Sequence, residues 1–391
     1  MIKFIKSVIV KLYKIIAGLL PVNKKIIVFE SNLFRNYTGN PRYIYETIVQ
    51  RNIDTKYKCV WFFKNPDSVN TSVIPGNAEC VKYKTLKFYY YMSVAGFVVS
   101  DSRLPNYLVK NKNTTYIQTW HGTPLKKLAL DMTSLDMAGS NNIEKYHNNF
   151  RVSSSKWDYL ISQNNFSTNI FKRCFAFDKT ILEIGYPRND VLINSSEEDI
   201  VATKKKMGLP LDKKIILYAP TWRDNQYYKK GEYKFASTID FDALRDAISD
   251  EYVMIVKYHY LIKDNVDWSK YEGFIYQYGE TEDIASLYLV SDVLITDYSS
   301  VMFDYSVLKR PMIFFTYDLE EYKNTLRGFY FDFLEEAPGP VVLDNDTLID
   351  SIKNYNFEDW KEKYEAFHNK YNHCDDGKAG EKVVELIQKL S

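Results

Sequence analysis

The amino-acid sequence predicts an α/β protein with two Rossmann-like domains, each built on a parallel sheet. Short apolar runs alternate with amphipathic helical segments, which is the pattern of α/β folds. The 391 residues exceed the size at which one hydrophobic core stops growing, so two domains are expected. Open parallel sheets bind ligands beyond the carboxyl ends of their strands. We therefore expect the two domains to face each other across a cleft.

The first series of elements follows Pro21. Apolar and β-branched runs predict strands at 25–31, 58–63, 96–100, 114–120, 159–162 and 181–185. Helices are predicted between them at 40–51, 86–94 and 167–175. Pro41 supports the start of the first helix, because the fixed φ of proline suits a first helical turn. This doubly wound unit is assigned to residues 23–205.

The second series begins after a polar stretch at 194–211, which is typical of a crossing between domains. Strands are predicted at 213–220, 252–258, 273–278, 293–296 and 311–315. Helices are predicted at 241–248, 283–290 and 300–309, followed by a helical tail at 356–390. This second unit is assigned to residues 206–391.

The N-terminal segment has an unusual charge pattern, since no acidic residue precedes Glu30. On a helix, four lysines gather on one side and apolar side chains on the other, which predicts an amphipathic helix over 1–22. Its longest apolar run, 15–22, is shorter than the roughly 20 residues needed to span a bilayer. We expect this helix to lie on an anionic membrane surface. The alternative is a helix packed against the protein's own core.

Composition excludes several classes of protein. The 51 Lys and Arg residues balance 50 Asp and Glu residues, so no global positive charge indicates nucleic-acid binding. The four cysteines lie far apart and only five histidines are present, which argues against a zinc site and a disulfide framework. The P-loop, the dinucleotide-binding G-x-G-x-x-G, the G-x-S-x-G elbow and H-E-x-x-H are absent from the sequence.

Two polar clusters follow strands of the first series. His121 ends an apolar strand ahead of a Gly-Thr-Pro turn, a position suited to proton transfer. The alternative for His121 is a buried histidine bonded to a carbonyl group. Arg188 lies at a turn after the strand at 181–185, where it either binds an anion or forms a structural corner.

Cations also follow strands of the second series. Arg223 comes after the strand at 213–220, and Lys257 and His259 end the strand at 252–258. The planar donor fork of arginine suits a phosphate group. Two cations and an imidazole on adjacent strand ends indicate an anion pocket more than a lattice of salt bridges.

A fifth polar cluster joins a strand to a helix at Thr296, Asp297, Ser299 and Ser300. Hydroxyl groups and free backbone N–H groups at a helix N-terminus bind phosphate, and capping of the helix uses the same donors. The second domain therefore indicates a nucleotide-diphosphate site, and the first supplies a histidine. This is the layout of a group transferase with an activated nucleotide donor. Neither a metal nor a cofactor is demanded, because the cations and the helix end could neutralise the leaving nucleotide.

Six sequence blocks occur in order: TWHGTPLK, GYPRND, APTWRD, KYH, TDYSSVMFDYSVLKRP and RGFYFDF. Together they resemble the CDP-glycerol glycerophosphotransferase family of teichoic acid synthesis, over about residues 25–390. The resemblance implies a GT-B-like fold, CDP-glycerol as donor and, as acceptor, a lipid-linked (undecaprenyl diphosphate) glycan or glycerol phosphate. It also implies peripheral attachment at the cytoplasmic face of the cell membrane. The basic N-terminal segment agrees with that location.

The resemblance also implies roles for single residues. His121 matches the histidine implicated as catalytic base, and Arg223 and His259 match positions near the donor pyrophosphate, where His259 is a second catalytic candidate. The remaining matches to donor-binding blocks are Arg188, Lys257, Thr296, Asp297, Ser299, Ser300, Asp304 and Arg327. A family stretch D-G-x-A-S corresponds here to 376–380, which ends in Gly380 instead of serine.

The expected reaction is transfer of glycerol phosphate to the lipid-linked acceptor with release of CMP, and the short chain favours one or a few additions. A ribitol phosphate transferase using CDP-ribitol and a primase adding the first unit are close alternatives. A glycosyltransferase using a nucleotide sugar on the same fold is a more distant one. A non-enzymatic scaffold would not need His121 or Arg223.

Overall fold

The computed structural model describes residues 2–134, 142–221, 227–229, 232–234, 238–258, 262–263, 266–279, 281–319 and 328–391. The chain forms two compact units. The first comprises Met1–His121, His147–Asp190 and Cys374–Ser391, and the second comprises Gly122–Tyr146 and Val191–His373. The units therefore interleave along the sequence, whereas the expected domains, 23–205 and 206–391, are consecutive.

The first unit is built on a parallel sheet of seven strands in the order β3-β2-β1-β4-β5-β6-β7. The strands are β1 (Asn23–Glu30), β2 (Lys58–Phe63), β3 (Glu79–Lys82), β4 (Ala95–Ser100), β5 (Thr115–Gln118), β6 (Tyr159–Ser162) and β7 (Thr180–Glu183). Every residue of β4 is buried, as expected for a central strand covered on both faces. The carboxyl ends of β1, β4 and β5 consequently lie next to one another.

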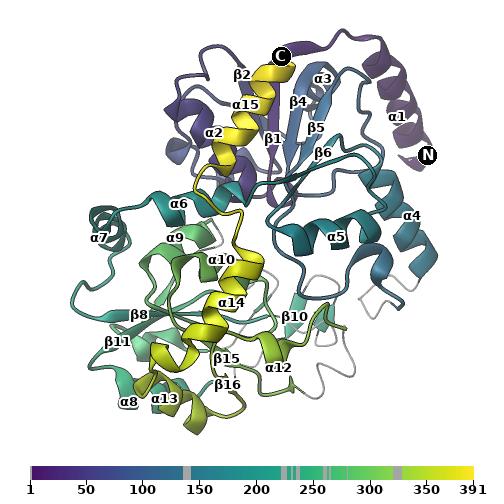
Figure 1. Ribbon diagram of the computed structural model, residues 1–391. Helices are drawn as coiled ribbons and strands as arrows, with labels where there is room; N and C mark the ends of the chain where they lie inside the picture. The colour runs from purple at the N-terminus through teal and green to yellow at the C-terminus, as the bar shows by residue number, and fades with distance from the viewer. Residues whose placement is uncertain are drawn as a thin grey trace. The chain divides into compact units, whose positions relative to one another are not determined.

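Helices flank this first sheet. They are α1 (Ile2–Leu19), α2 (Gly39–Gln50), α3 (Leu86–Val94), most of α4 (Ile143–Ser154), α5 (Asn165–Cys174) and α15 (Ala379–Leu390), with short turns η1 (Asn32–Phe34) and η5 (Pro187–Asn189). The C-terminal α15 lies beside α2 (Figure 1). Its Val383, Val384 and Ile387 are buried in the same core as Trp61 and Tyr45. The last helix of the chain thus completes the core that the first strands begin.

The second unit is built on a parallel sheet of six strands. In spatial order they are β13 (Ile275–Gln277), β11 (Tyr252–Val256), β8 (Lys214–Ala219), β14 (Val293–Thr296), β15 (Met312–Phe315) and β16 (Val341–Val342). The described helices that lie wholly or mostly in this unit are α6 (Asp190–Asn194), α7 (Glu197–Lys206), α8 (Phe241–Ile248), α9 (Ile284–Val290), α10 (Val301–Tyr305), α12 (Phe333–Glu336), α13 (Asn345–Lys353) and α14 (Lys361–Tyr371). A small sheet contains β9 (Tyr227–Lys229), β10 (Glu232–Lys234) and β12 (Ile262–Lys263).

The segment expected to be helical over 1–22 forms α1, and one face of it docks on the first unit. The hydroxyl oxygen of Tyr13 accepts a hydrogen bond from the Val109 N–H at 3.3 Å. The Asn111 side-chain amide donates to the carbonyl oxygens of Ala17 and Leu20, at 3.4 and 3.2 Å, and so caps the helix end. Among the side chains described from residue 10 onward, the large apolar ones that remain exposed on α1 are Leu12, Ile15, Ile16 and Leu19. Within the described ranges, no helix combines the length and apolarity that crossing a membrane requires.

Candidate functional site

His121 follows β5 at the carboxyl edge of the first sheet. Its Nδ1 lies 2.9 Å from the backbone carbonyl oxygen of Asp101, which follows the neighbouring strand β4. A carbonyl oxygen only accepts hydrogen bonds, so Nδ1 carries the proton and Nε2 is left as a proton acceptor. The ring stacks on Trp120, with centroids 4.3 Å apart. The sequence-based alternative of a carbonyl-bonded histidine is therefore correct for Nδ1, while the side chain as a whole is exposed rather than buried.

The residue before His121 has an unusual backbone conformation. Trp120 has φ of 53°, in the left-handed region that non-glycine residues rarely adopt. Such strain persists only where surrounding contacts hold it, and it is concentrated at functional sites. Here the holding contacts come from Asn40, which is buried at the start of α2.

No sequence pattern points to Asn40, yet it connects two of the predicted site residues. Its side-chain amide donates to the carbonyl oxygens of Thr119 and Trp120, at 3.3 and 3.0 Å. Its side-chain oxygen accepts a hydrogen bond from the Arg188 N–H at 3.1 Å. The turn η5, which carries Arg188, is thereby tied to the strand end that carries His121. An asparagine between a glycine and a proline at a helix start has no pattern that would reveal this role.

Charged neighbours adjust the protonation of His121. Desolvation by the surrounding atoms lowers the pKa of the ring, although part of the side chain is exposed. The charges of Arg188 and Arg103 lower that pKa further, while Asp101 opposes them. A lowered pKa keeps the imidazole neutral near pH 7, which is the form that can accept a proton. Arg188 thus acts electrostatically on His121 within the first unit.

In the second unit, three of the predicted site residues are buried. The Thr296 hydroxyl donates to the Ala219 carbonyl oxygen at 2.7 Å, which ties the end of β14 to the end of β8. Asp297 Oδ1 accepts a hydrogen bond from the Thr221 N–H at 2.8 Å. Asp304 is buried within α10. Thr296 and Asp297 therefore hold the ends of β8 and β14 together, and the place of all three residues at the donor site stays a prediction.

The other described candidates of the second unit are more accessible. Ser299 and Ser300 are half-buried directly before α10, and Ser299 Oγ accepts a long hydrogen bond, 3.4 Å, from the Val301 N–H. Lys257 follows β11 and donates from Nζ to the Gly279 carbonyl oxygen at 2.6 Å. Lys257 therefore fixes the loop ahead of α9 while it places a positive charge near the same sheet edge. Arg223, His259 and Arg327 lie outside the described residues.

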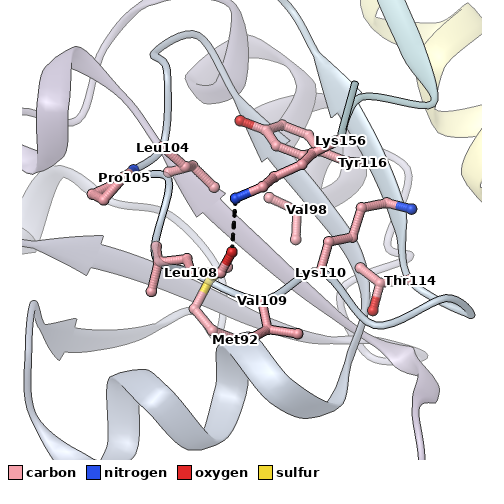
Figure 2. Close-up of a pocket in the computed structure, with 10 residues that line it drawn as sticks. All are labelled: Met92, Val98, Leu104, Pro105, Leu108, Val109, Lys110, Thr114, Tyr116 and Lys156. Atoms are coloured by element: carbon pink, nitrogen blue, oxygen red, sulfur yellow. Dashed lines mark hydrogen bonds between the residues drawn. The ribbon is translucent and has the colours of Figure 1, made fainter. Parts of the chain in front are cut away.

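The first unit also contains a small cavity of about 20 Å³ between α3, β4, β5 and the segment 104–110. Figure 2 shows Lys156 extending to the carbonyl oxygen of Leu108, a hydrogen bond of 3.0 Å. A space of this size holds about one water molecule, so it is too small for a nucleotide.

Comparison with known proteins identifies the class. A family model described as CDP-Glycerol:Poly(glycerophosphate) glycerophosphotransferase matches residues 12–389. The match confirms the expected class, an enzyme that transfers a substituted phosphate group. The chain belongs to this glycerophosphotransferase family.

Relatives and solved structures agree with this membership. The chain is 46% identical to the teichoic acid poly(glycerol phosphate) polymerase of Bacillus subtilis (strain 168), over 99% of this chain but only 52% of that relative. It therefore spans about half the length of that protein. A polymerase of the same name from Bacillus spizizenii (strain ATCC 23059 / NRRL B-14472 / W23) is 43% identical, over 98% of this chain and 97% of the relative.

The solved structure of the wall teichoic acid polymerase TagF aligns with a TM-score of 0.91 and 43% identity, covering 99% of this chain and 96% of that one. A further TagF structure, of a variant, was obtained after a soak with CDPG. This similarity confirms the expected α/β fold with two Rossmann-like sheets of the GT-B-like type.

Proposed function

We propose that the protein transfers glycerol phosphate from CDP-glycerol to a hydroxyl group of a membrane lipid-linked acceptor and releases CMP. The observation that carries this proposal is the geometry of His121, whose Nδ1–H is fixed by a carbonyl oxygen so that Nε2 can accept a proton. The family membership and the CDPG soak of TagF support the choice of donor.

In the proposed reaction, Nε2 of His121 takes the proton of the acceptor hydroxyl. The acceptor oxygen then forms a bond to the phosphorus atom that bears glycerol, and the bond from that phosphorus to the CMP oxygen breaks. Arg188 lies within electrostatic reach of His121 and is suited to a phosphate oxygen. Ser299 and Ser300 are proposed to bind the donor pyrophosphate with their hydroxyl groups, and Lys257 to supply positive charge near them. His259, Arg223 and Arg327 keep their proposed roles from the family resemblance.

The first experiment is CMP release from CDP-glycerol with a lipid-linked disaccharide acceptor. We expect His121→Ala to lower the rate by about 100-fold or more, because general base catalysis contributes roughly 10² to 10⁴. His368→Ala is a matched control, since His368 lies on α14 of the second unit and outside the proposed site. Equal rates in the wild type and His121→Ala would contradict the proposal.

The same assay separates the alternatives. Release of CMP from CDP-ribitol but not from CDP-glycerol would identify a ribitol phosphate transferase with the same mechanism. Activity only with a nucleotide sugar would identify a glycosyltransferase. Product lengths resolve the number of additions. Short chain length no longer favours a single addition, because a relative covered for 97% of its length is named a polymerase.

For location, we propose that α1 attaches the protein peripherally to the cytoplasmic face of an anionic membrane. The support is the exposed apolar face of α1 together with the exposed Lys11 and Lys14. Apolar area and basic charge both contribute to the binding of an amphipathic helix to such a surface.

A further inference from the structure

The first unit contains two neighbouring buried carboxyl groups that the proposed reaction does not use, and one of them, Asp101, adjoins His121. Glu30 ends β1, and Asp101 follows β4. Asp101 Oδ1 accepts hydrogen bonds from the Asn32 N–H at 2.9 Å and the Ser102 hydroxyl at 2.8 Å. Its Oδ2 accepts from the Ser31 hydroxyl at 2.5 Å. Buried polar groups of this kind fix their own backbone as well as their partners.

Glu30 has a similar set of donors. Its Oε1 accepts from the Phe34 N–H at 2.7 Å, and its Oε2 lies 2.5 Å from the Ser100 hydroxyl. The donors Asn32 and Phe34 belong to η1, a turn with positive φ at each of its residues. Between them, the Leu33 N–H donates to Ser102 Oγ at 2.9 Å. Three successive N–H groups of this turn thus donate to the side chains of Asp101, Ser102 and Glu30. These hydrogen bonds therefore hold the strained turn against the two carboxyl groups.

Two neighbouring buried carboxyl groups do not both ionise readily. Burial, followed by the charge of Asp101, raises the pKa of Glu30 to about 8. Burial also raises the pKa of Asp101, whereas the charge of His121 and three hydrogen-bond donors lower it. The Asp101 carboxylate accepts hydrogen bonds from three donors and the Glu30 carboxylate from two, so the hydrogen bonding favours Asp101 as the bearer of the single negative charge of the pair.

We propose that Asp101 is a positioning residue for His121. Its carbonyl oxygen fixes the ring with the proton on Nδ1, and its ionised carboxylate stabilises the imidazolium that forms when Nε2 takes a proton from the acceptor. The charged groups that face the ring are Asp101 after β4, Arg103 in the following loop and Arg188 in η5, with Glu30 behind Asp101. This inference rests on the proposed role of His121 as a base.

The first test is the pH dependence of kcat/KM for Asp101→Asn, which removes the charge and keeps the size. We expect the acidic limb, which reports deprotonation of His121, to move to lower pH by about 0.5 unit or more. We expect kcat to fall about ten-fold, because a weaker base abstracts a proton more slowly. KM for CDP-glycerol should change little. An unmoved acidic limb would overturn the proposal.

A matched control has the same substitution at the opposite edge of the same sheet, where Asp158 directly precedes β6. Asp158 accepts a hydrogen bond from the Tyr116 N–H at 2.8 Å and pairs with Lys110 at 2.9 Å. Asp158→Asn should alter stability without moving the acidic limb. A shift of the same size in Asp158→Asn would mean that general loosening of the sheet, and not the charge of Asp101, sets the profile.

A second measurement needs neither substrate nor a stable Asp101 variant. In protein labelled with ¹⁵N-histidine, the His121 signals are assigned by their loss in His121→Gln. We expect a proton on Nδ1 in the wild type, and a lower His121 pKa in Ser31→Ala, where Asp101 loses a donor and holds its charge less well. A proton on Nε2, or an unchanged pKa, would overturn the proposal. Because this titration uses no donor, its result is independent of whether CDP-glycerol is the substrate.

Discussion

Gly380 lies where the first unit leaves no room for a side chain. A Cβ atom at this position would lie 2.6 Å from Thr47 Oγ1 and 3.2 Å from Asp190 Oδ2. Its backbone N–H also donates to Asp190 Oδ2 at 2.7 Å, which fixes the start of α15. The glycine that replaces the serine of the family stretch is therefore required by the packing around it.

We expect Gly380→Ser to lower the free energy of unfolding by about 1–3 kcal/mol, the usual cost of overpacking a close contact. Thr47→Ala removes the nearest atom, so the double variant Thr47→Ala/Gly380→Ser should recover part of the loss. Urea unfolding of the four proteins measures this coupling. Additive effects of the two substitutions would show that the contact with Thr47 is not the cause.

The raised pKa values of Glu30 and Asp190 predict how stability depends on pH. Burial is the main cause of both shifts, to about 8 for Glu30 and about 7 for Asp190. The folded protein then holds protons that the unfolded chain has released, so the free energy of unfolding falls as pH rises from about 5 to 8. Glu30→Gln removes one of the two contributions and should make this decrease shallower. Urea titrations of the wild type and Glu30→Gln at pH 5.5 and 8 measure this decrease. An equal decrease in both proteins would contradict the prediction.

At the scale of elements, η1 is the most strained turn among the described residues with positive φ. Asn32, Leu33 and Phe34 have φ of 47°, 56° and 66° in succession. Each left-handed residue that is not glycine costs roughly 1–2 kcal/mol. The hydrogen bonds to Glu30 and Ser102 offset this cost.

Leu33 is partly exposed, so its backbone conformation can be tested with little change in packing. Leu33→Ile keeps the volume but adds a branch at Cβ, and we expect it to lower the free energy of unfolding by about 1 kcal/mol or more. Leu33→Gly should cost nothing or stabilise. Thermal unfolding compares the three proteins, and an isoleucine variant as stable as the wild type would be evidence against a strained turn.

The exposed face of α1 gives the test of membrane attachment. The exposed fraction is 54% at Leu12 and 80% at Leu19, while Tyr13 and Ala17 on the docking face are buried. We expect Leu12→Ser/Leu19→Ser to lower sedimentation with anionic vesicles several-fold, because apolar burial drives such binding. Leu211 and Leu343 are similarly exposed in the second unit, so Leu211→Ser/Leu343→Ser is the matched control. Equal loss in both proteins would argue against a role for α1.

The sequence predicts elements with strong apolar patterns and fails where the pattern is short or polar. The strand at 58–63 and the helices at 86–94 and 241–248 have the predicted bounds. β3 has only four residues and β16 only two, too few to show alternation. The expected tail at 356–390 is instead η9 (Phe357–Trp360), α14 and α15 with a break between the two helices.

The same limit applies to the candidate site. The position of His121 at the carboxyl edge of the first sheet was predictable, because the residue follows an apolar strand within a distinctive block. The roles of Asn40 and Asp101 depend on hydrogen bonds to residues 79 and 20 positions away, and no local pattern encodes those contacts. Burial of Thr296 and Asp304 likewise depends on neighbouring strands rather than on their own block.

At the scale of the whole molecule, each unit has its own hydrophobic core. Ile387 of α15 is buried in the core of the first unit, and Ile352 of α13 in that of the second. Ile387→Ala should destabilise by about 2–5 kcal/mol. We expect faster hydrogen exchange in β1 and β2 for Ile387→Ala, and in β8 and β11 for Ile352→Ala. Faster exchange throughout the chain in either variant would show that the units unfold together.

The position of α15 also affects the order in which a newly made chain can fold. The second unit ends at His373, so all of it has been synthesised before α15 exists. At roughly 5–20 residues per second, a ribosome takes on the order of 10–40 s to translate Val191–His373. During that time the strands of the first sheet have emerged without the helix that completes their core. The part of the protein that is translated first is thus the part that finishes folding last, and its exposed apolar surface gives chaperones time to bind.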